Sequence, residues 1–356
     1  MKILHVYPKA DEMVAQHVEQ LMEGMQLSAE VQAMSNLADF KSVCRSFKPD
    51  IVHCHGCWQY NIVNAGNFAR KQGVRIVLSP HGQLEPWVIE EKPLQDKFHK
   101  TILWQKPFVE KAYALITFGK MEQQYLAQLK WNPRIEVIHN ALITNSTTRE
   151  KMCSQTFAVY QKVLDSNVLE QMDDDTQQLM ATIIKAGTLG DRRWTEFVLP
   201  ETVDWRRMLI YAEHQNIRNY VDYGINILGL SPLSLDTEHI PAYFPEHYQR
   251  PQSIKKLIGD YKGDETDYLV RMIRQIEKQP LLLHLIEFTR ELYRDTVNDD
   301  TLHEAIEEKG LTKFAGRLMQ VLHEQTLLDE GYMPIDPIDD RGTQKIRDHI
   351  TNHLKI

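Results

Sequence analysis

Two kinds of hydrophobic pattern alternate along the first 145 residues, and this alternation restricts the fold more than any other feature of the chain. Short apolar runs typical of buried strands are separated by longer segments in which apolar residues recur with helical spacing. Such alternation produces a parallel sheet, because each helix carries the chain back to the edge where the next strand begins. We therefore predict a doubly wound, Rossmann-like α/β domain over residues 1–145. Its strands are expected at Ile3–Tyr7, Val31–Met34, Ile51–His55, Val74–Leu78, Ala114–Phe118 and Ile135–Ile138.

The pattern changes after Asn145–Thr148, and helical spacing then continues almost to the end of the chain. We predict a second, mostly α-helical domain over residues 150–356, with single long helices at Val168–Ala186 and Asp204–Leu228 among others. Residues 151–356 are acidic, with 24 Lys and Arg against 34 Asp and Glu, whereas residues 1–150 carry 17 against 15. The acidic balance argues against a nucleic-acid partner.

The apolar runs and the cysteines of the chain predict neither a membrane span nor a disulfide framework. The longest apolar run is far shorter than the roughly 20 residues that a bilayer span needs. The first residues do not have the pattern of a secretory signal. Four cysteines spread over 356 residues indicate a reducing compartment, so a cytoplasmic location is expected.

The segment Ser79–Trp87 contains the first candidate site. It follows a predicted strand and places His81 beside Gly82. Ligands of α/β proteins bind at the carboxyl ends of the strands, and glycine allows the backbone to approach a ligand closely. His81 is therefore a candidate for contact with a ligand, and Glu85 could add a carboxylate. The alternative is a loop histidine that bonds only to the backbone.

The segment Val52–Trp58 is rich in histidine and cysteine, which invites a zinc interpretation. Strand geometry argues against it, because His53 and His55 share one face while Cys54 points to the other. Cys54 and Cys57 have the spacing of a zinc-ligand pair, but no second pair of ligands follows at a suitable distance. We therefore assign no metal ligand. His55 and Gly56 are instead expected to lie near the ligand crevice.

The turn after the first strand lacks the glycines of a dinucleotide site. Pro8–Glu12 occupies this position and brings Lys9 to it. This argues against classical dinucleotide binding. The sequence also contains no phosphate-binding loop, nucleophile elbow or zinc-protease motif.

Five elements in order resemble the N-terminal half of glycosyltransferase family 4. They are Ile3–Pro8, Asp50–Gly56, Ser79–Gly82, Ala114–Thr117 and Ile135–Ala141. The amino-acid sequence of Ser79–Trp87 resembles that of bacterial family members that build surface polysaccharides. The resemblance covers about residues 1–145 and does not extend to the helical half.

The resemblance implies a GT-B type enzyme that transfers a sugar from a nucleotide-sugar donor to a glycan or lipid-linked acceptor in surface-polysaccharide synthesis. It implies metal-independent chemistry, with no cofactor besides the nucleotide-sugar substrate. His81 would be the catalytic residue, in contact with the transferring sugar. The expected substrate-binding residues are Lys9, His55, Gly56, Gly82, Glu85, Asn140, Arg192 and Arg193.

The chain departs from the family in its second half. Family members carry a second Rossmann-like domain that holds the donor, and here an acidic helical domain replaces it. One hypothesis is an enzyme that completes its site with the helical half, with a partner subunit or with a second copy, in peripheral association with a membrane if the acceptor is lipid-linked. The other is a non-catalytic relative that binds a glycan, a nucleotide sugar or a protein.

Overall fold

The computed structural model describes residues 1–86, 101–191, 193, 197–232, 234–294 and 296–356. The chain divides into two compact units. The first, here called the sheet unit, comprises Met1–Ser166 and Pro241–Tyr243. The second, the helical unit, comprises Asn167–Ile240 and Phe244–Ile356. None of the described helices is both long and apolar enough to span a bilayer.

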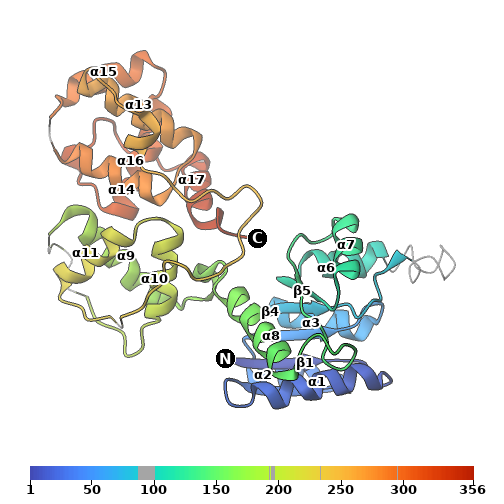
Figure 1. Ribbon diagram of the computed structural model, residues 1–356. Coiled ribbons are helices and arrows are strands. Elements are labelled where there is room, and N and C mark those ends of the chain that lie inside the picture. Colours follow the sequence, from blue (N-terminus) through green and yellow to red (C-terminus); the bar gives the residue numbers. More distant parts are fainter. Residues whose placement is uncertain (87–100, 192, 194–196, 233, 295) are drawn as a thin grey trace. The chain divides into compact units, whose positions relative to one another are not determined.

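A single parallel sheet forms the centre of the sheet unit (Figure 1). Its strands are β1 (Lys2–Val6), β2 (Glu30–Met34), β3 (Ile51–His55), β4 (Arg75–Ser79), β5 (Ala114–Thr117) and β6 (Ile135–Val137). They lie in the order β2-β1-β3-β4-β5-β6, and every neighbouring pair is parallel. Every residue of β3 and β4 is buried, because helices cover both faces of the sheet. The predicted doubly wound α/β domain is confirmed.

Helices pack on both faces of this sheet. The helices of the sheet unit are α1 (Glu12–Met25), α2 (Phe40–Phe47), α3 (Tyr60–Lys71), α6 (Lys106–Glu110), α7 (Lys120–Leu129) and α8 (Arg149–Leu164), with a π-helical turn at Thr101–Gln105 before α6. Helices α2 and α3 share an apolar core with Val52 and Cys54 of β3. Helix α8 reaches the opposite face, where its Tyr160 contacts His53.

Helix α8 belongs to the sheet unit, although residues 150–164 were expected in the second domain. It packs beside α1, where the Cys153 thiol donates to the Gln20 carbonyl at 3.4 Å. Arg149 pairs with Glu23 at 2.6 Å in the same contact. The apolar face of α8 is thus buried against α1 and the sheet, a partner that helical spacing alone does not reveal.

The order of the strands fixes where a ligand crevice can form. The chain leaves β1 toward β2 on one side and then returns to place β3 on the other side of β1. Connections on the two sides of such a switch point diverge, which opens a crevice beyond the carboxyl ends of the two strands. In this chain the crevice lies beyond Val6 of β1 and His55 of β3.

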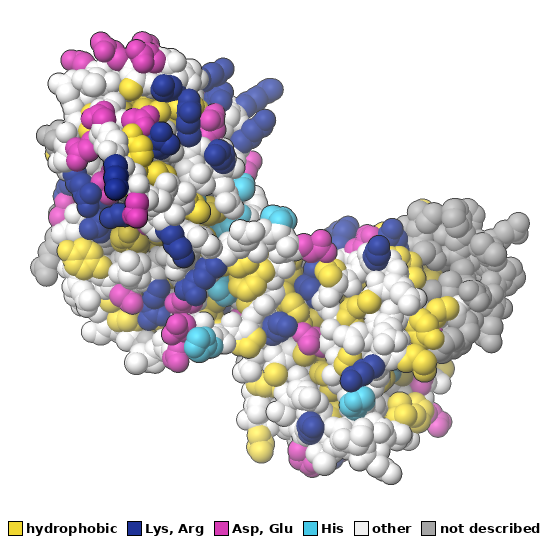
Figure 2. All heavy atoms as spheres, turned by 45° about the horizontal axis from the view of Figure 1, so that its top comes forward, with side chains coloured by type: hydrophobic (Ala, Val, Ile, Leu, Met, Phe, Trp, Pro, Cys, Tyr) yellow, Lys and Arg dark blue, Asp and Glu magenta, His cyan; other side chains and the backbone are white. Residues whose placement is uncertain are grey.

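The helical unit contains only helices and loops among the described residues, as predicted. Its elements are the 3-10 turn η2 (Val168–Gln171), α9 (Asp174–Leu189), α10 (Trp205–His214), α11 (Arg218–Leu228), α12 (Ile254–Ile258), α13 (Glu265–Lys278), α14 (Leu282–Leu292), α15 (Asp299–Glu308), α16 (Thr312–Thr326), the 3-10 turn η3 (Glu330–Tyr332) and α17 (Arg341–Asn352). One apolar core joins them. Acidic and basic side chains are interspersed over the face of this unit drawn in Figure 2.

The prediction of two single long helices in this unit is wrong, because the structure divides each segment into two elements. The segment predicted as Val168–Ala186 breaks at Met172 and Asp173, both extended, and the Asp173 carboxylate then caps α9. The segment predicted as Asp204–Leu228 breaks at Asn216, whose φ of 54° is left-handed and cannot continue a helix. Local capping and turn preferences therefore override helical spacing at both places.

Candidate functional site

The structure brings the predicted residues of β3 and β4 together at one edge of the sheet. Gly56 follows β3 and donates its backbone N–H to the Ser79 carbonyl at 2.8 Å, so the two strand ends stay paired. His81 then lies beside His55, with 3.0 Å between His55 Nδ1 and His81 Nε2. The two histidines are brought together because parallel strands end at the same edge.

His81 and Gly82 form a turn with unusual backbone geometry. Their φ angles are 53° and 74°, so a non-glycine residue occupies the left-handed region at His81. The turn is held by Glu122 of α7, whose carboxylate accepts the Gly82 N–H at 2.7 Å and the Phe118 N–H at 3.0 Å. Backbone strain of this kind persists where surrounding contacts determine it, and it is common at binding sites.

The His81 ring is neutral near pH 7. It packs against the Phe118 ring, with centroids 4.8 Å apart. Burial lowers the pKa of His81 to about 3, and the nearby His17 also lowers it. A neutral imidazole can accept a hydrogen bond at one nitrogen and donate one at the other.

Glu85 lies in the same turn. Its backbone N–H donates to the Gly82 carbonyl at 3.2 Å. Burial and the neighbouring Glu122 carboxylate raise the pKa of Glu85, and burial also raises the pKa of Glu122. Two carboxyl groups with raised pKa values therefore lie beside the His81 turn. Trp87, the last residue of the predicted motif, lies outside the described residues.

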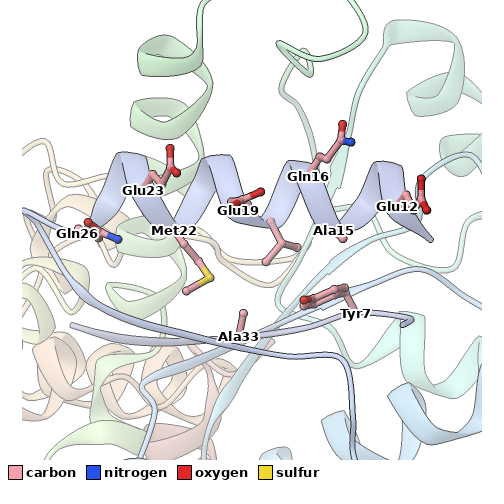
Figure 3. A pocket seen from close by; sticks show the side chains of 10 residues that line it. Tyr7, Glu12, Ala15, Gln16, Glu19, Met22, Glu23, Gln26 and Ala33 are labelled. Atoms are coloured by element: carbon pink, nitrogen blue, oxygen red, sulfur yellow. The ribbon is translucent and has the colours of Figure 1, made fainter. Parts of the chain in front are cut away.

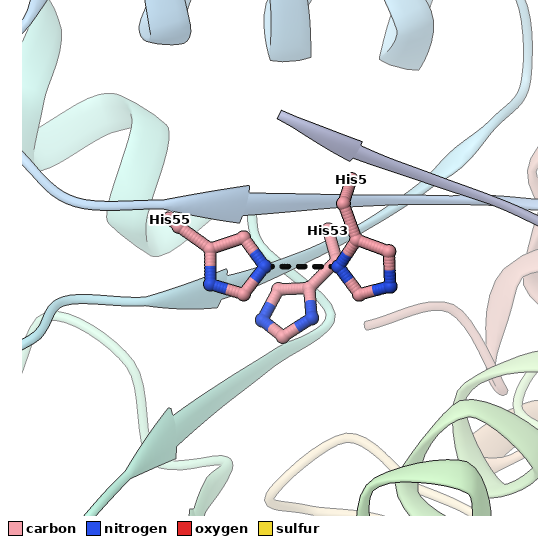
Figure 4. A group of neighbouring side chains, drawn as sticks. All are labelled: His5, His53 and His55. Atoms are coloured by element: carbon pink, nitrogen blue, oxygen red, sulfur yellow. Dashed lines mark hydrogen bonds between the residues drawn. The ribbon is translucent and has the colours of Figure 1, made fainter. Parts of the chain in front are cut away.

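Five histidines gather on one face of the sheet, here called the histidine cluster: His5, His17, His53, His55 and His81. His5 of β1 is paired in register with His53 of β3, and His5 Nδ1 lies 3.0 Å from His55 Nε2 (Figure 4). Burial lowers the pKa of His5 to about 3 and that of His17 to about 4. It holds the pKa values of His53 and His55 well below the usual range.

Side chains from other elements surround this cluster. The Tyr160 hydroxyl lies 2.6 Å from His53 Nδ1, and the Ser79 hydroxyl lies 2.8 Å from His53 Nε2. Asn140, predicted as a substrate contact, is buried and hydrogen-bonds to His17. Its side-chain oxygen also accepts the Leu142 N–H at 2.9 Å, so Asn140 stabilises the loop after β6.

A pocket of about 790 Å³ opens at the switch point; of the predicted site residues Lys9 lines it, whereas His81 and the rest of the histidine cluster do not. Its walls come from the end of β1, the loop after β2 and the first turns of α3. Lys9 is exposed at its rim, and Lys41 is a second cation in the wall. Gln59 and Asn61 add amide groups. This combination suits an anionic ligand that also carries hydroxyl groups.

Residues 8–141 match the family model of a glycosyl transferase 4-like domain. The N-terminal part of this chain is a glycosyl transferase 4-like domain. The match covers each site residue predicted in the first 145 residues and confirms the resemblance read from the motifs. It does not extend into the helical unit. No curated protein and no solved structure matches the chain.

A second pocket of the glycosyl transferase 4-like domain is acidic. It has a volume of about 680 Å³ and lies along α1, between this helix and Tyr7 and Ala33 of the sheet (Figure 3). Glu12, Glu19 and Glu23 line it, so the negative charge of a nucleotide diphosphate would be repelled there. The switch-point pocket is therefore the better candidate.

The arginines predicted as substrate contacts lie in the helical unit. Arg192 lies outside the described residues. Arg193 pairs with Asp191 at 2.6 Å and with Asp329 at 2.5 Å. The hydrogen bond to Asp191 raises the pKa of Arg193. A phosphate group would have to compete with two carboxylates for this guanidinium. A pocket of about 400 Å³ elsewhere in the unit is lined by Arg271, Arg274, Lys278 and Lys309, with Asp267 as an acidic neighbour.

Sequence reasoning missed several residues of this edge: His5, His17, Ser79, Glu122 and Tyr160. A signal existed for His5, because alternation places it on the same face as His53 once β1 and β3 are paired. No such signal marks Glu122 or Tyr160. Each reaches the edge from a helix whose rotation depends on the packed structure.

Proposed function

We propose that this protein is a metal-independent glycosyltransferase. It transfers a sugar from a nucleotide-sugar donor to a glycan or lipid-linked acceptor in surface-polysaccharide synthesis, on the cytoplasmic side of the membrane. The proposal is supported by the glycosyl transferase 4-like domain and by the pocket at its switch point. The domain match supports a nucleotide-sugar substrate and nothing more specific. The acceptor and the pathway are part of the proposal.

The observation that carries the proposal is the strained His81–Gly82 turn at the edge of the sheet. Glu122 occupies the Gly82 N–H, and His55 faces His81 Nε2. The Nδ1 atom of His81 makes no hydrogen bond to another described residue. We assign this atom to a hydroxyl group of the transferring sugar, with the neutral ring fixed in place before substrate arrives.

Transfer also requires positive charge beside the departing nucleotide diphosphate. In the sheet unit, Lys9 at the pocket rim is the proposed contact. Gly56 and Glu85 are proposed to line the sugar side, and Asn140 to support the loop beside it. Further cations would come from the helical unit, through Arg192 and Arg193, or from a partner subunit or second copy.

A second candidate function is a non-catalytic module that binds a nucleotide sugar or glycan. Two observations favour it. The described part of the second unit contains helices in place of a second parallel sheet. Arg193 is already neutralised by Asp191 and Asp329. Such a module would retain the sheet-edge site and lose turnover.

A panel of nucleotide sugars separates the two functions. Thermal stabilisation of the full chain reports binding, and release of the nucleotide diphosphate reports turnover. An enzyme should show both stabilisation and release of nucleotide diphosphate with at least one donor. Both signals should be smaller in the His81→Ala variant. The control is His139→Ala, which removes an exposed histidine outside the cluster. Stabilisation without release supports the binding module. Neither signal with any donor contradicts the enzyme and a module that binds nucleotide sugars.

A further inference from the structure

Three members of the histidine cluster form a compact set of nitrogen donors. His5, His53 and His55 each offer one ring nitrogen, and these atoms all lie within 4.8 Å of one another. All three side chains are fully buried. Figure 4 shows them converging from β1 and β3. Because two paired strands carry them, their spacing is set by the sheet rather than by a loop.

A metal ion binds the lone pair of a neutral imidazole. Each of the three histidines has a second ring nitrogen, which can carry the ring proton while the first nitrogen binds the ion.

The surroundings provide the outer contacts that metal-binding histidines usually have. His55 has its second nitrogen 3.0 Å from His81 Nε2. His53 has one nitrogen beside Tyr160 and the other beside Ser79, so it keeps one such partner whichever nitrogen it uses. His5 has no such outer contact among the described residues, because its Nε2 is buried without a hydrogen-bond partner.

We propose that His5, His53 and His55 bind one divalent transition-metal ion of the zinc class. The distance of 3.0 Å between His5 Nδ1 and His55 Nε2 is close to the ~3.3 Å between two nitrogens on a tetrahedral zinc ion. The three nitrogens lie within 4.8 Å of one another, so the rings would turn and close around the ion, and the proton shared by His5 and His55 would move to the other nitrogen of its ring. The Tyr160 oxygen, 2.6 Å from His53 Nδ1, is an oxygen donor beside the set.

The donor set selects the class of ion. Imidazole nitrogen suits zinc, copper and nickel, whereas magnesium and calcium require oxygen ligands. Cys54 is not a ligand, because it lies in the apolar core on the other face of the sheet. The proposed role of the ion is to hold the ends of β1 and β3 together and to fix His55, which faces His81. It takes no part in sugar transfer, so this inference does not depend on the proposed function.

Metal titration of the full chain tests the proposal. Protein stripped with a chelator is titrated with Zn²⁺ against a chromophoric competitor, and with Co²⁺ by visible absorption. We expect one ion per chain and the intense absorption of tetrahedral Co²⁺. His5→Gln should weaken Zn²⁺ binding by at least about 100-fold. The matched control is His214→Gln, since His214 is also buried with an unpartnered Nδ1 but belongs to the helical unit.

Each outcome of these experiments either supports or overturns the metal site. Binding of less than a tenth of an equivalent of Zn²⁺ by the wild-type chain, or equal affinity in wild type and His5→Gln, overturns the site. If His5→Gln does not fold, X-ray absorption of the zinc-loaded wild type replaces it. Three imidazole nitrogens at ~2.0 Å support the site, and sulfur ligands at ~2.3 Å overturn it in favour of the cysteines.

Discussion

At the scale of single residues, burial determines what the sheet edge can do chemically. The histidines of the cluster are held neutral, and Glu85 and Glu122 are pushed toward the protonated form. In the proposed function, His81 would therefore meet the sugar as a hydrogen-bonding group rather than as a positive charge. Any charge needed for a diphosphate must come from lysine and arginine.

The neutral histidines make the protein sensitive to acid. Their folded pKa values lie below the ~6.5 of an unfolded chain, so the unfolded chain binds more protons as the pH falls. The stability that they contribute is complete above pH ~6.5 and is lost toward pH 4 and 3, by up to ~1.4 kcal/mol per pH unit for each histidine. Urea unfolding at pH 7.5, 6 and 5 measures this. An unfolding free energy that does not change over this range contradicts the neutral cluster.

Glu122 is expected to stabilise the His81 turn. Glu122→Ala leaves the N–H groups of Gly82 and Phe118 without their acceptor, at a cost of ~2 kcal/mol. The control is Glu110→Ala, because Glu110 is exposed and, within the described part of the chain, makes only a long ion pair with Lys106. Urea midpoints compare the two. Equal loss in both variants would show that the carboxylate does not hold the turn.

At the scale of elements, one pair of helices in the helical unit packs unusually closely. Gly187 of α9 and Gly224 of α11 lie at their contact, and a Cβ atom on Gly187 would lie 2.0 Å from the Tyr220 carbonyl oxygen. A Cβ on Gly224 would lie 2.1 Å from the Ile183 carbonyl oxygen. Both obstacles are backbone atoms, which a side-chain rotation cannot relieve.

Alanine at either glycine should separate the two helices. We expect Gly187→Ala and Gly224→Ala to lower the free energy of unfolding by ~2–3 kcal/mol, despite the better helix propensity of alanine. Gly331→Ala is the control, since no atom lies within 4 Å of its Cβ position. Thermal melting followed by circular dichroism measures all three. A gain in stability at Gly187 or Gly224 would contradict the close packing.

At the scale of the whole molecule, the chain passes between the two units more than once. It leaves the sheet unit after Ser166, returns at Pro241–Tyr243 and leaves again. Tyr243 attaches the returning segment to the sheet unit. Its N–H donates to the Ser166 hydroxyl at 2.6 Å, and its hydroxyl donates to Glu136 at 2.6 Å. Lys162 lies over its ring, 4.1 Å from the centroid.

The returning segment is expected to stabilise the sheet unit. Tyr243→Ala removes a buried ring and its hydrogen bond, at a cost of ~3 kcal/mol. Hydrogen exchange should then quicken in peptides from β6 and α8, while α13 and α14 stay protected. Tyr223→Ala, at a largely exposed tyrosine, is the control. Unchanged exchange in β6 and α8 would show that the segment is a passive linker.

The sequence predicts the sheet unit well because its signals are local and repeated. Short segments rich in apolar residues mark β3 and β4, and parallel strands end at one edge, which is enough to bring His55 to His81. Their contact with Glu122 and Tyr160 depends on how helices rotate against the sheet, and no local pattern encodes that. In the helical unit, Asn216 breaks a helix through its left-handed backbone, a feature that helical spacing does not register.

Donor turnover by the His81 variant tests the central claim most directly. The claim is that the edge formed by β3, β4 and the His81 turn binds and positions a nucleotide sugar. Release of nucleotide diphosphate should fall at least about tenfold in His81→Ala, which is the loss of one hydrogen bond of ~1.4 kcal/mol or more in the transition state. His139→Ala should stay close to wild type. Equal turnover in wild type and His81→Ala would contradict the account.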